Sequence, residues 1–290
     1  MNTSSFSDAR RDALRLALAS AGALALPALA QARAPRLVTI SGAITEVVYV
    51  LGAEAQLVGT DTTSIYPAAA LKTPKVGYMR QLSAEGLLSL KPDAVIATTE
   101  SGPTVVLDQL RGAGVKLELV EADHSWAEVQ RKVQAVGRAA AREAQARELQ
   151  VRLDAEWAQV QQRVAAASGR KQRVLFVLSH SASPQVSGEK TAAHAVIGFA
   201  GGVNCLGGFQ GYRPMTAEAM ASAAPDVILT TTQSLEAHGG VDKFWQRPEL
   251  ALTPAFRQRA LIAHDAVLLL GFGPRLPWAI GELHTQLLKA

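Results

Sequence analysis

A tyrosine and an arginine stand two residues apart in the segment Gly77-Tyr78-Met79-Arg80. A guanidinium beside a phenol favours the charged phenolate form. A phenolate oxygen is a hard ligand, and tyrosine is one of the side chains that hold ferric iron in proteins. An exposed Tyr-x-Arg is also common as a surface hydrogen-bonding pair, so the spacing alone leaves both interpretations open.

The surroundings of this pair occur twice in the chain. The stretch SAEGLLSLKPDAVIATT, residues 83–99, recurs as TAEAMASAAPDVILTTT, residues 216–232, with seven of seventeen positions identical. Each copy predicts a hydroxyl N-cap, a short helix, a Pro-Asp turn and an apolar strand. An aromatic-plus-arginine loop precedes each copy, GYMRQ in the first and GYRPM in the second. We therefore expect two similar lobes with a ligand cleft between them.

Further candidate residues lie in the second half. Tyr212, Arg213 and Met215 correspond to the Tyr78 loop with an offset of one residue, so we expect them to pack against or hydrogen-bond a ligand, and iron ligation by Tyr212 stays open. His180 follows an apolar strand and is expected on the cleft rim, where a single loop histidine is usually a polar surface group. Arg275, in the segment GFGPR, either pairs with a ligand carboxylate or belongs to a plain turn.

Alternating strands and helices predict an α/β fold with parallel central sheets. Besides the apolar strand at the end of each repeat copy, we expect strands at 36–40, 58–61, 116–120, 173–178, 204–206 and 266–270. Helices are expected at 45–51, 105–113, from 125 onward, 194–200, 254–259 and 277–288, whereas residues 66–76 are expected to form a loop.

Residues 141–167 carry apolar side chains at three- and four-residue steps and contain neither glycine nor proline. A helix of this length spans roughly 40 Å, which suits a connection between two lobes. A helix packed wholly on one lobe is the alternative. The expected organisation is an export signal at 1–32, an N-terminal lobe at 33–140, a linking helix at 141–168 and a C-terminal lobe at 169–290. A single rigid linking helix favours small lobe motions.

The first thirty-two residues have the composition of an export signal. Arg10, Arg11 and Arg15 precede an apolar run at 16–29 and small residues suited to cleavage. The paired arginines leave the general secretory and twin-arginine routes both open. We therefore expect a cleaved signal peptide and a periplasmic mature chain.

Composition excludes several classes of function. The 290 residues are 48% hydrophobic and 19% charged, and the net charge of +4 is scattered and forms no basic stripe for nucleic acid. One cysteine, Cys205, excludes a multi-cysteine metal site, and burial in a core is expected for it. The string Ser187-Gly188-Glu189-Lys190 matches S-x-x-K without the partner motifs of penicillin-recognising enzymes. We expect no catalytic activity.

The segments GAITEVVYVLGAEAQLVGTDTTSIYP, VGYMRQLSAEGLLSLKPD and GFGPR, together with the long linker, resemble the haem-binding proteins of bacterial haem ABC importers. These are substrate-binding proteins whose two lobes are joined by one helix. The resemblance implies that Tyr78 is the axial ligand of haem iron and that Arg80 supports it. Some members have a histidine ligand at the place of His180, so one or two bound haems are both compatible with the sequence.

Glu85 and Glu218 occupy the same place in the two repeat copies, in a first helical turn where a carboxylate complements the helix dipole. The resemblance implies that they also engage arginines on two permease subunits. It further implies haem transport for iron uptake, with an inner-membrane ABC permease dimer and its ATPase as partners of a monomeric chain. A siderophore or corrinoid carrier of the same fold is the alternative, and a periplasmic chelatase-like enzyme is a more distant one.

Overall fold

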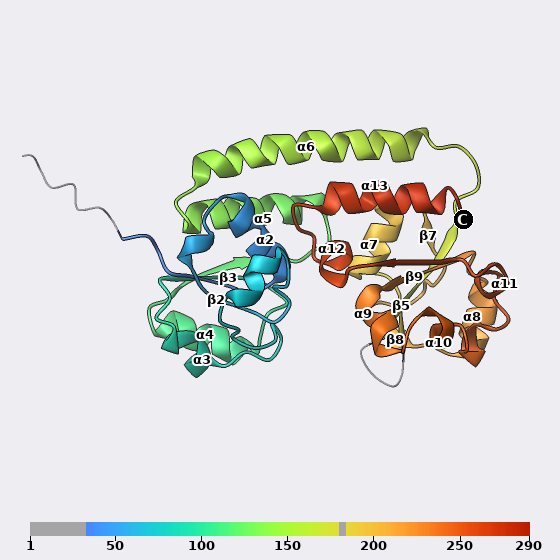
Figure 1. Cartoon of the computed structure of the whole chain (residues 1–290), viewed down its shortest axis with the longest axis horizontal. Coiled ribbons are helices and arrows are strands. Elements are labelled where there is room, and N and C mark those ends of the chain that lie inside the picture. Colours follow the sequence, from blue (N-terminus) through green and yellow to red (C-terminus); the bar gives the residue numbers. More distant parts are fainter. Residues whose placement is uncertain (1–32, 180–183) are drawn as a thin grey trace, which may run out of the picture. The chain divides into compact units, whose positions relative to one another are not determined.

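The computed structural model describes residues 33–179 and 184–290, and the second of the chain's two units comprises residues 35–290. The two-lobed fold lies in the second unit (Figure 1). The expected signal at 1–32 and His180 lie outside the described residues. Within the described part of the chain, no helix has both the length and the apolar character that crossing a bilayer requires.

The first lobe is a four-stranded, wholly parallel sheet in the order β2-β1-β3-β4, with helices on its faces. Its strands are β1 (Leu37–Thr39), β2 (Leu57–Thr60), β3 (Ala94–Thr98) and β4 (Lys116–Val120). Its helices are α2 (Gly42–Val50), α3 (Ala84–Ser89), α4 (Thr104–Gly112) and α5 (Trp126–Ala139), with 3-10 turns η1 (Glu54–Gln56) and η2 (Ala68–Lys72). Strand β3 is buried along its whole length, as expected for a strand covered on both faces.

The second lobe has a six-stranded mixed sheet in the order β10-β9-β5-β6-β8, with β7 also paired to β5. Its strands are β5 (Arg173–Leu178), β6 (Gln185–Ser187), β7 (Val203–Asn204), β8 (Tyr212–Pro214), β9 (Val227–Thr231) and β10 (Leu261–His264). Its helices are α7 (Ala192–Phe199), α8 (Ala217–Ala223), α9 (Thr232–Ala237), α10 (Val241–Phe244), η3 (Pro248–Leu250), α11 (Pro254–Gln258), α12 (Ala266–Leu270) and α13 (Leu276–Leu287). The α/β fold with two lobes is confirmed, while β6 and β8 run antiparallel to their neighbours.

The repeat has the predicted local structure in both lobes. Ser83 caps α3 by accepting a hydrogen bond from Gly86 N, and Thr216 caps α8 by accepting one from Ala219 N. The aspartate of each Pro-Asp turn, inside the aligned stretch, bonds a residue outside that stretch. Asp93 accepts a hydrogen bond from the backbone N of Arg36, and Asp226 accepts one from the backbone N of Arg173.

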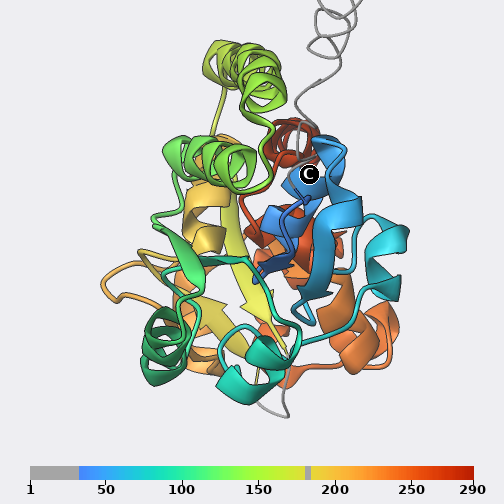
Figure 2. The same cartoon turned by 90° about the vertical axis from the view of Figure 1, so that its left-hand side faces the viewer.

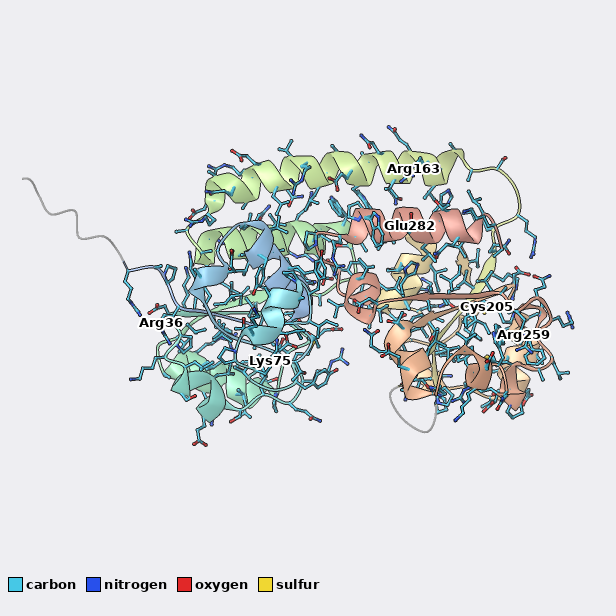
Figure 3. The ribbon with its side chains drawn as sticks, in the orientation of Figure 1. Arg36, Lys75, Arg163, Cys205, Arg259 and Glu282 are labelled. Atoms are coloured by element: carbon cyan, nitrogen blue, oxygen red, sulfur yellow. The ribbon has the colours of Figure 1, made fainter. Side chains whose placement is uncertain are left out.

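These two arginines also occupy equivalent positions. The Arg36 guanidinium, labelled in Figure 3, donates to the carbonyl of Leu90 at 2.7 Å, at the end of α3. The Arg173 guanidinium donates to the carbonyl of Ala223 at 2.6 Å, at the end of α8. Each arginine therefore satisfies carbonyls that a helix end leaves without intrahelical partners, and it fixes the repeat helix to the central strand of its own lobe.

Three of our predictions about elements are wrong. Residues 266–270 form helix α12 instead of a strand, because Asp265 caps them by accepting a hydrogen bond from Leu268 N at 2.9 Å; the strand is β10, just before. Residues 68–72, expected in a loop, form η2. The segment Tyr212–Pro214, expected in a loop, is the edge strand β8 because it pairs with β6.

Helix α6 (Glu143–Ala166) connects α5 of the first lobe to β5 of the second along the chain, and it lies over α5 and α13 (Figure 1). Figure 2 shows α5 and α6 nearly end-on. Trp157 on α6 stacks on Trp126 of α5 at 4.9 Å between ring centroids and meets the edge of Phe199 of α7 at 5.0 Å. One buried apolar cluster runs from Leu37 in the first lobe to Leu287 in the second. The lobes therefore share a hydrophobic core in addition to the helix between them.

Candidate functional site

A cavity of about 550 Å³ is lined by residues of both lobes. On the first lobe, its walls come from segments that follow the carboxyl ends of parallel strands, the usual place for ligands in open α/β sheets. Ser41 follows β1, Thr63 follows β2 and Glu100 follows β3. Thr98, at the end of β3, also lines the cavity, and its buried hydroxyl has no hydrogen-bond partner among the described residues. The cavity volume of about 550 Å³ is within the range of small-molecule sites.

Tyr78 lies in the wall of this cavity with 41% of its surface exposed. Gly77 allows the preceding backbone to turn with φ 101°, a conformation that favours glycine, and Gln81 N donates to the Tyr78 carbonyl at 2.8 Å. Among the described residues, no hydrogen bond reaches the phenol of Tyr78. Its oxygen is therefore available to a ligand.

Arg80 lies in the same wall but is paired with an acid that the sequence did not single out. Its Nη2 is 3.1 Å from Oε2 of Glu100. Both residues line the cavity. Glu100 directly follows a buried strand in the sequence, but its approach to the Tyr78 loop depends on the tertiary structure, so no local pattern singles it out.

Tyr212 lines the cavity from the second lobe, where it begins β8. Burial raises the pKa of Tyr212 to about 12, the negative charge of Glu100 acts in the same direction, and Arg80 opposes both. The phenol is therefore neutral at physiological pH and can donate a hydrogen bond to a ligand.

The two neighbours of Tyr212 do not line the cavity. Successive side chains of a strand point to opposite faces, so Arg213 turns away from Tyr212 and lies over the ring of Phe209 at 4.4 Å. Met215 is buried in the core of the second lobe. Neither Arg213 nor Met215 is among the residues that line the cavity, so the structure gives no support to their expected ligand contacts.

Arg275 is also placed elsewhere than we expected. Its guanidinium donates to both carboxylate oxygens of Glu46, at 2.8 and 2.5 Å, and lies 3.6 Å from the ring centroid of Tyr66. It lines a different hollow, together with Tyr49 and Arg152. A guanidinium engaged in this way ties α2 of the first lobe to the segment before α13 of the second, and it does not reach the cavity of Tyr78.

A buried lysine, Lys132, is one of the residues that line the cavity. Lys132 on α5 lies 2.5 Å from Oε1 of Glu128 and donates to the carbonyls of Gly271 and Phe272, at 2.7 and 3.2 Å. Burial lowers the pKa of Lys132, and the carboxylate of Glu128 counteracts this effect. These contacts join the first lobe to the segment after α12, and no pattern in the sequence predicted them.

Glu85 and Glu218 are exposed in the first turns of α3 and α8. Neither carboxylate forms an ion pair with another described residue. Cys205 packs beside the core of the second lobe (Figure 3), and burial raises the pKa of its thiol to about 12. The cysteine is therefore an unreactive packing residue, as predicted.

Residues 37–268 match the model of the family described as periplasmic binding protein. The chain belongs to this family. Among solved structures, it is similar to the periplasmic haem-binding protein BhuT in complex with two haems, with 43% identity, a TM-score of 0.83 and coverage of 87% of this chain and 97% of that one. The periplasmic haem-binding protein RhuT from Roseiflexus sp. RS-1, in apo form, is 37% identical with the same TM-score, over 88% and 98% of the two chains.

Curated relatives of this periplasmic binding protein match over shorter stretches. An uncharacterized ABC transporter substrate-binding lipoprotein of Bacillus subtilis, YvrC, is 27% identical over 199 residues, which are 68% of this chain and 63% of the relative. The vitamin B12-binding protein of Yersinia pestis is 34% identical over 101 residues, 35% of each chain. The matched region thus spans less than two thirds of the length of these relatives.

Proposed function

We propose that this chain is a periplasmic protein that captures haem in the cavity between its lobes and delivers it to an inner-membrane ABC importer. The observation that carries the proposal is the phenol of Tyr78, which has no hydrogen-bond partner among the described residues and faces a cavity that both lobes line. The similarity to BhuT, whose structure holds two haems, supports the same ligand.

In this proposal, the phenolate of Tyr78 holds ferric haem iron, and the cationic Arg80 in the same wall stabilises that anion. Tyr212 reaches the ligand from the opposite lobe as a neutral phenol, because the pKa of its hydroxyl is about 12. Apolar cavity residues such as Val267 and Leu270 contact the porphyrin. Binding rather than catalysis is the proposed task.

Delivery requires a partner. The exposed carboxylates of Glu85 and Glu218 stand at equivalent places on α3 and α8 and are proposed to engage arginines of the two permease subunits, whose ATPase drives transport. We further propose that the chain acts as a monomer, that residues 1–32 direct export and are cleaved, and that His180 is the second iron ligand. A second haem beside the first remains part of this proposal.

Titration of the purified protein with ferric haem tests the proposal. We expect a saturable spectrum of phenolate-ligated ferric haem at micromolar haem, and its endpoint gives the number of haems bound. A chain that binds no haem at this concentration would refute haem capture. Mixing of the loaded protein with importer in proteoliposomes, with ATP, tests delivery.

A corrinoid carrier is the second candidate, because the chain is 34% identical over 101 residues to a vitamin B12-binding protein. Cyanocobalamin competes with haem for the cavity if this candidate is correct. A siderophore carrier predicts competition by a ferric siderophore instead. Haem binding that neither compound affects excludes both alternatives.

A further inference from the structure

Arg80 and Glu100 belong to two segments that the backbone holds together. Gly102 N donates to the carbonyl of Met79 at 2.9 Å, and Leu82 N donates to the carbonyl of Gly102 at 3.0 Å. The loop of Arg80 and the turn that follows Glu100 are therefore fixed against each other. The 3.1 Å contact between the two side chains follows from this backbone arrangement.

The pair is easy to separate. The side chains of Arg80 and Glu100 are 55% and 38% exposed, so solvent screens their attraction and the pair contributes little to folding stability. Arg80 therefore exchanges Glu100 for another anion in the cavity at low cost. The phenolate that Tyr78, two residues away, would form on binding ferric iron is such an anion.

Glu100 also acts on the second tyrosine. Its charge, after burial, is the next largest cause of the raised pKa of Tyr212. Because this effect passes between residues of the two lobes, the Glu100 carboxylate lies within electrostatic reach of both walls.

We infer that Glu100 limits the strength of haem capture by competing with the Tyr78 phenolate for Arg80. This inference rests on the proposed haem function and adds to it a residue that sets affinity. Glu100 does not touch the iron in this scheme; it positions Arg80. In the ligand-free chain Arg80 bonds Glu100, and in the loaded chain Arg80 turns to the phenolate.

The test is Glu100→Gln, which keeps the shape of the side chain and removes its charge. Loss of an exposed ion-pair competitor corresponds to a two- to fivefold change in equilibrium, so we expect haem to bind about two- to fivefold tighter. Glu118→Gln is the matched control. Glu118 on β4 forms a similar pair with Arg138 on α5, at 2.9 Å, and does not line the cavity. The control is expected to leave the Kd for haem unchanged.

Two further measurements separate this role from a general effect of charge or folding. In the Arg80→Met background, Glu100→Gln is expected to produce no gain in haem affinity, since no guanidinium remains to compete for. With metal-free protoporphyrin, which forms no phenolate–iron bond, the gain is expected to disappear in the otherwise wild-type chain as well.

Unchanged or weaker haem binding by Glu100→Gln overturns the inference while leaving the proposed function intact. An equal gain in the Arg80→Met background, or with metal-free protoporphyrin, overturns it too, because the effect then does not pass through Arg80 and the phenolate. A wild-type chain that binds no haem refutes the proposed function and this inference together.

Discussion

Tyr78 and Tyr212 line the same cavity from opposite lobes and are similarly exposed, at 41% and 37%. Desolvation of its hydroxyl group and the charge of Glu100 raise the pKa of Tyr212 to about 12, although the residue as a whole is partly exposed. Tyr78 precedes Arg80 by two residues in the same wall of the cavity. Tyr78 is the proposed iron ligand and Tyr212 the proposed hydrogen-bond donor, so we expect the two tyrosines to have different tasks.

Replacement of each tyrosine by phenylalanine separates these tasks. We expect Tyr78→Phe to abolish the phenolate–iron absorption of bound ferric haem and to weaken binding at least tenfold, because the ligand oxygen is gone. Tyr212→Phe, the matched control, is expected to keep the absorption and to weaken binding by a factor of about five, equivalent to one lost hydrogen bond. Spectral titration measures both. Phenolate absorption that survives in Tyr78→Phe would exclude Tyr78 as the ligand.

The raised pKa of Tyr212 also predicts how stability depends on alkaline pH. The hydroxyl ionises near pH 10 in the unfolded chain and near pH 12 in the folded one. The unfolded state therefore loses this proton first, and the folded state is progressively destabilised as pH rises from about 10 to 12.

Urea denaturation of the wild-type chain and of Tyr212→Phe across this range measures the contribution. The free energy of unfolding should fall more steeply with pH in the wild type, and the two curves should run parallel below pH 10. Parallel curves throughout would contradict the assignment of a raised pKa to Tyr212.

At the scale of elements, the short contacts that cross between lobes come from residues buried in helices. Lys132 on α5 is fully buried and bonds Glu128 on its own helix and two carbonyls after α12. Glu46 on α2 is buried and bonds Arg275. At the start of the same helix, a methyl group on Gly42 would lie 2.5 Å from the carbonyl oxygen of Thr63 and 2.8 Å from Val267 of α12. Glycine is therefore required where α2 approaches α12.

Lys132→Met tests the cost of leaving Glu128 without its cation. Removal of one partner of a buried ion pair typically destabilises a protein by about 3 to 5 kcal/mol, so we expect a loss of this size in urea denaturation. The double variant Lys132→Met with Glu128→Gln removes both charges and should recover a large part of the loss. A single variant as stable as the wild type would show that the contacts of Lys132 do not stabilise the fold.

The elements themselves were largely predictable where local signals agree. Ser83 and Thr216 cap their helices as the sequence predicts, because a hydroxyl at the N-cap bonds a backbone N–H only three residues away. Residues 266–270 show the limit of this approach. Five apolar residues fit a buried strand and a helix equally well, and the choice depended on Asp265 and on β10 occupying the sheet edge.

At the scale of the whole molecule, the two lobes share more than a linking helix. The apolar cluster that includes Leu37, Leu153 of α6 and Leu287 passes through both lobes, and Trp157 and Phe199 pack against it. Opening of the cleft by a large rotation would expose part of this cluster to water at a cost of roughly 25 cal/mol per Å². We therefore expect small lobe motions on ligand binding, with side-chain exchange such as that of Arg80 as the main response.

Symmetry between the lobes predicts how the importer recognises the chain. We expect the Glu85→Gln, Glu218→Gln double variant to lose haem transfer to importer in proteoliposomes, with unchanged affinity for haem, because these carboxylates stand away from the cavity. Each single variant should retain partial transfer. Glu143→Gln, which removes an exposed first-turn glutamate from α6, is the matched control. Normal transfer by the double variant would exclude this docking mode.

The sequence by itself determined the α/β class, the repeated cap-helix-turn-strand unit and the candidate tyrosine, because each depends on contacts among residues a few positions apart. Only the tertiary structure decided which charges meet. Arg275 bonds Glu46 across 229 positions, Lys132 bonds the carbonyl of Gly271 across 139, and Arg80 bonds Glu100 across 20. No local pattern encodes such pairs, since the approach of the strands and helices creates them. For this reason Tyr78 could be found from the sequence, whereas the acid that competes for its arginine could not.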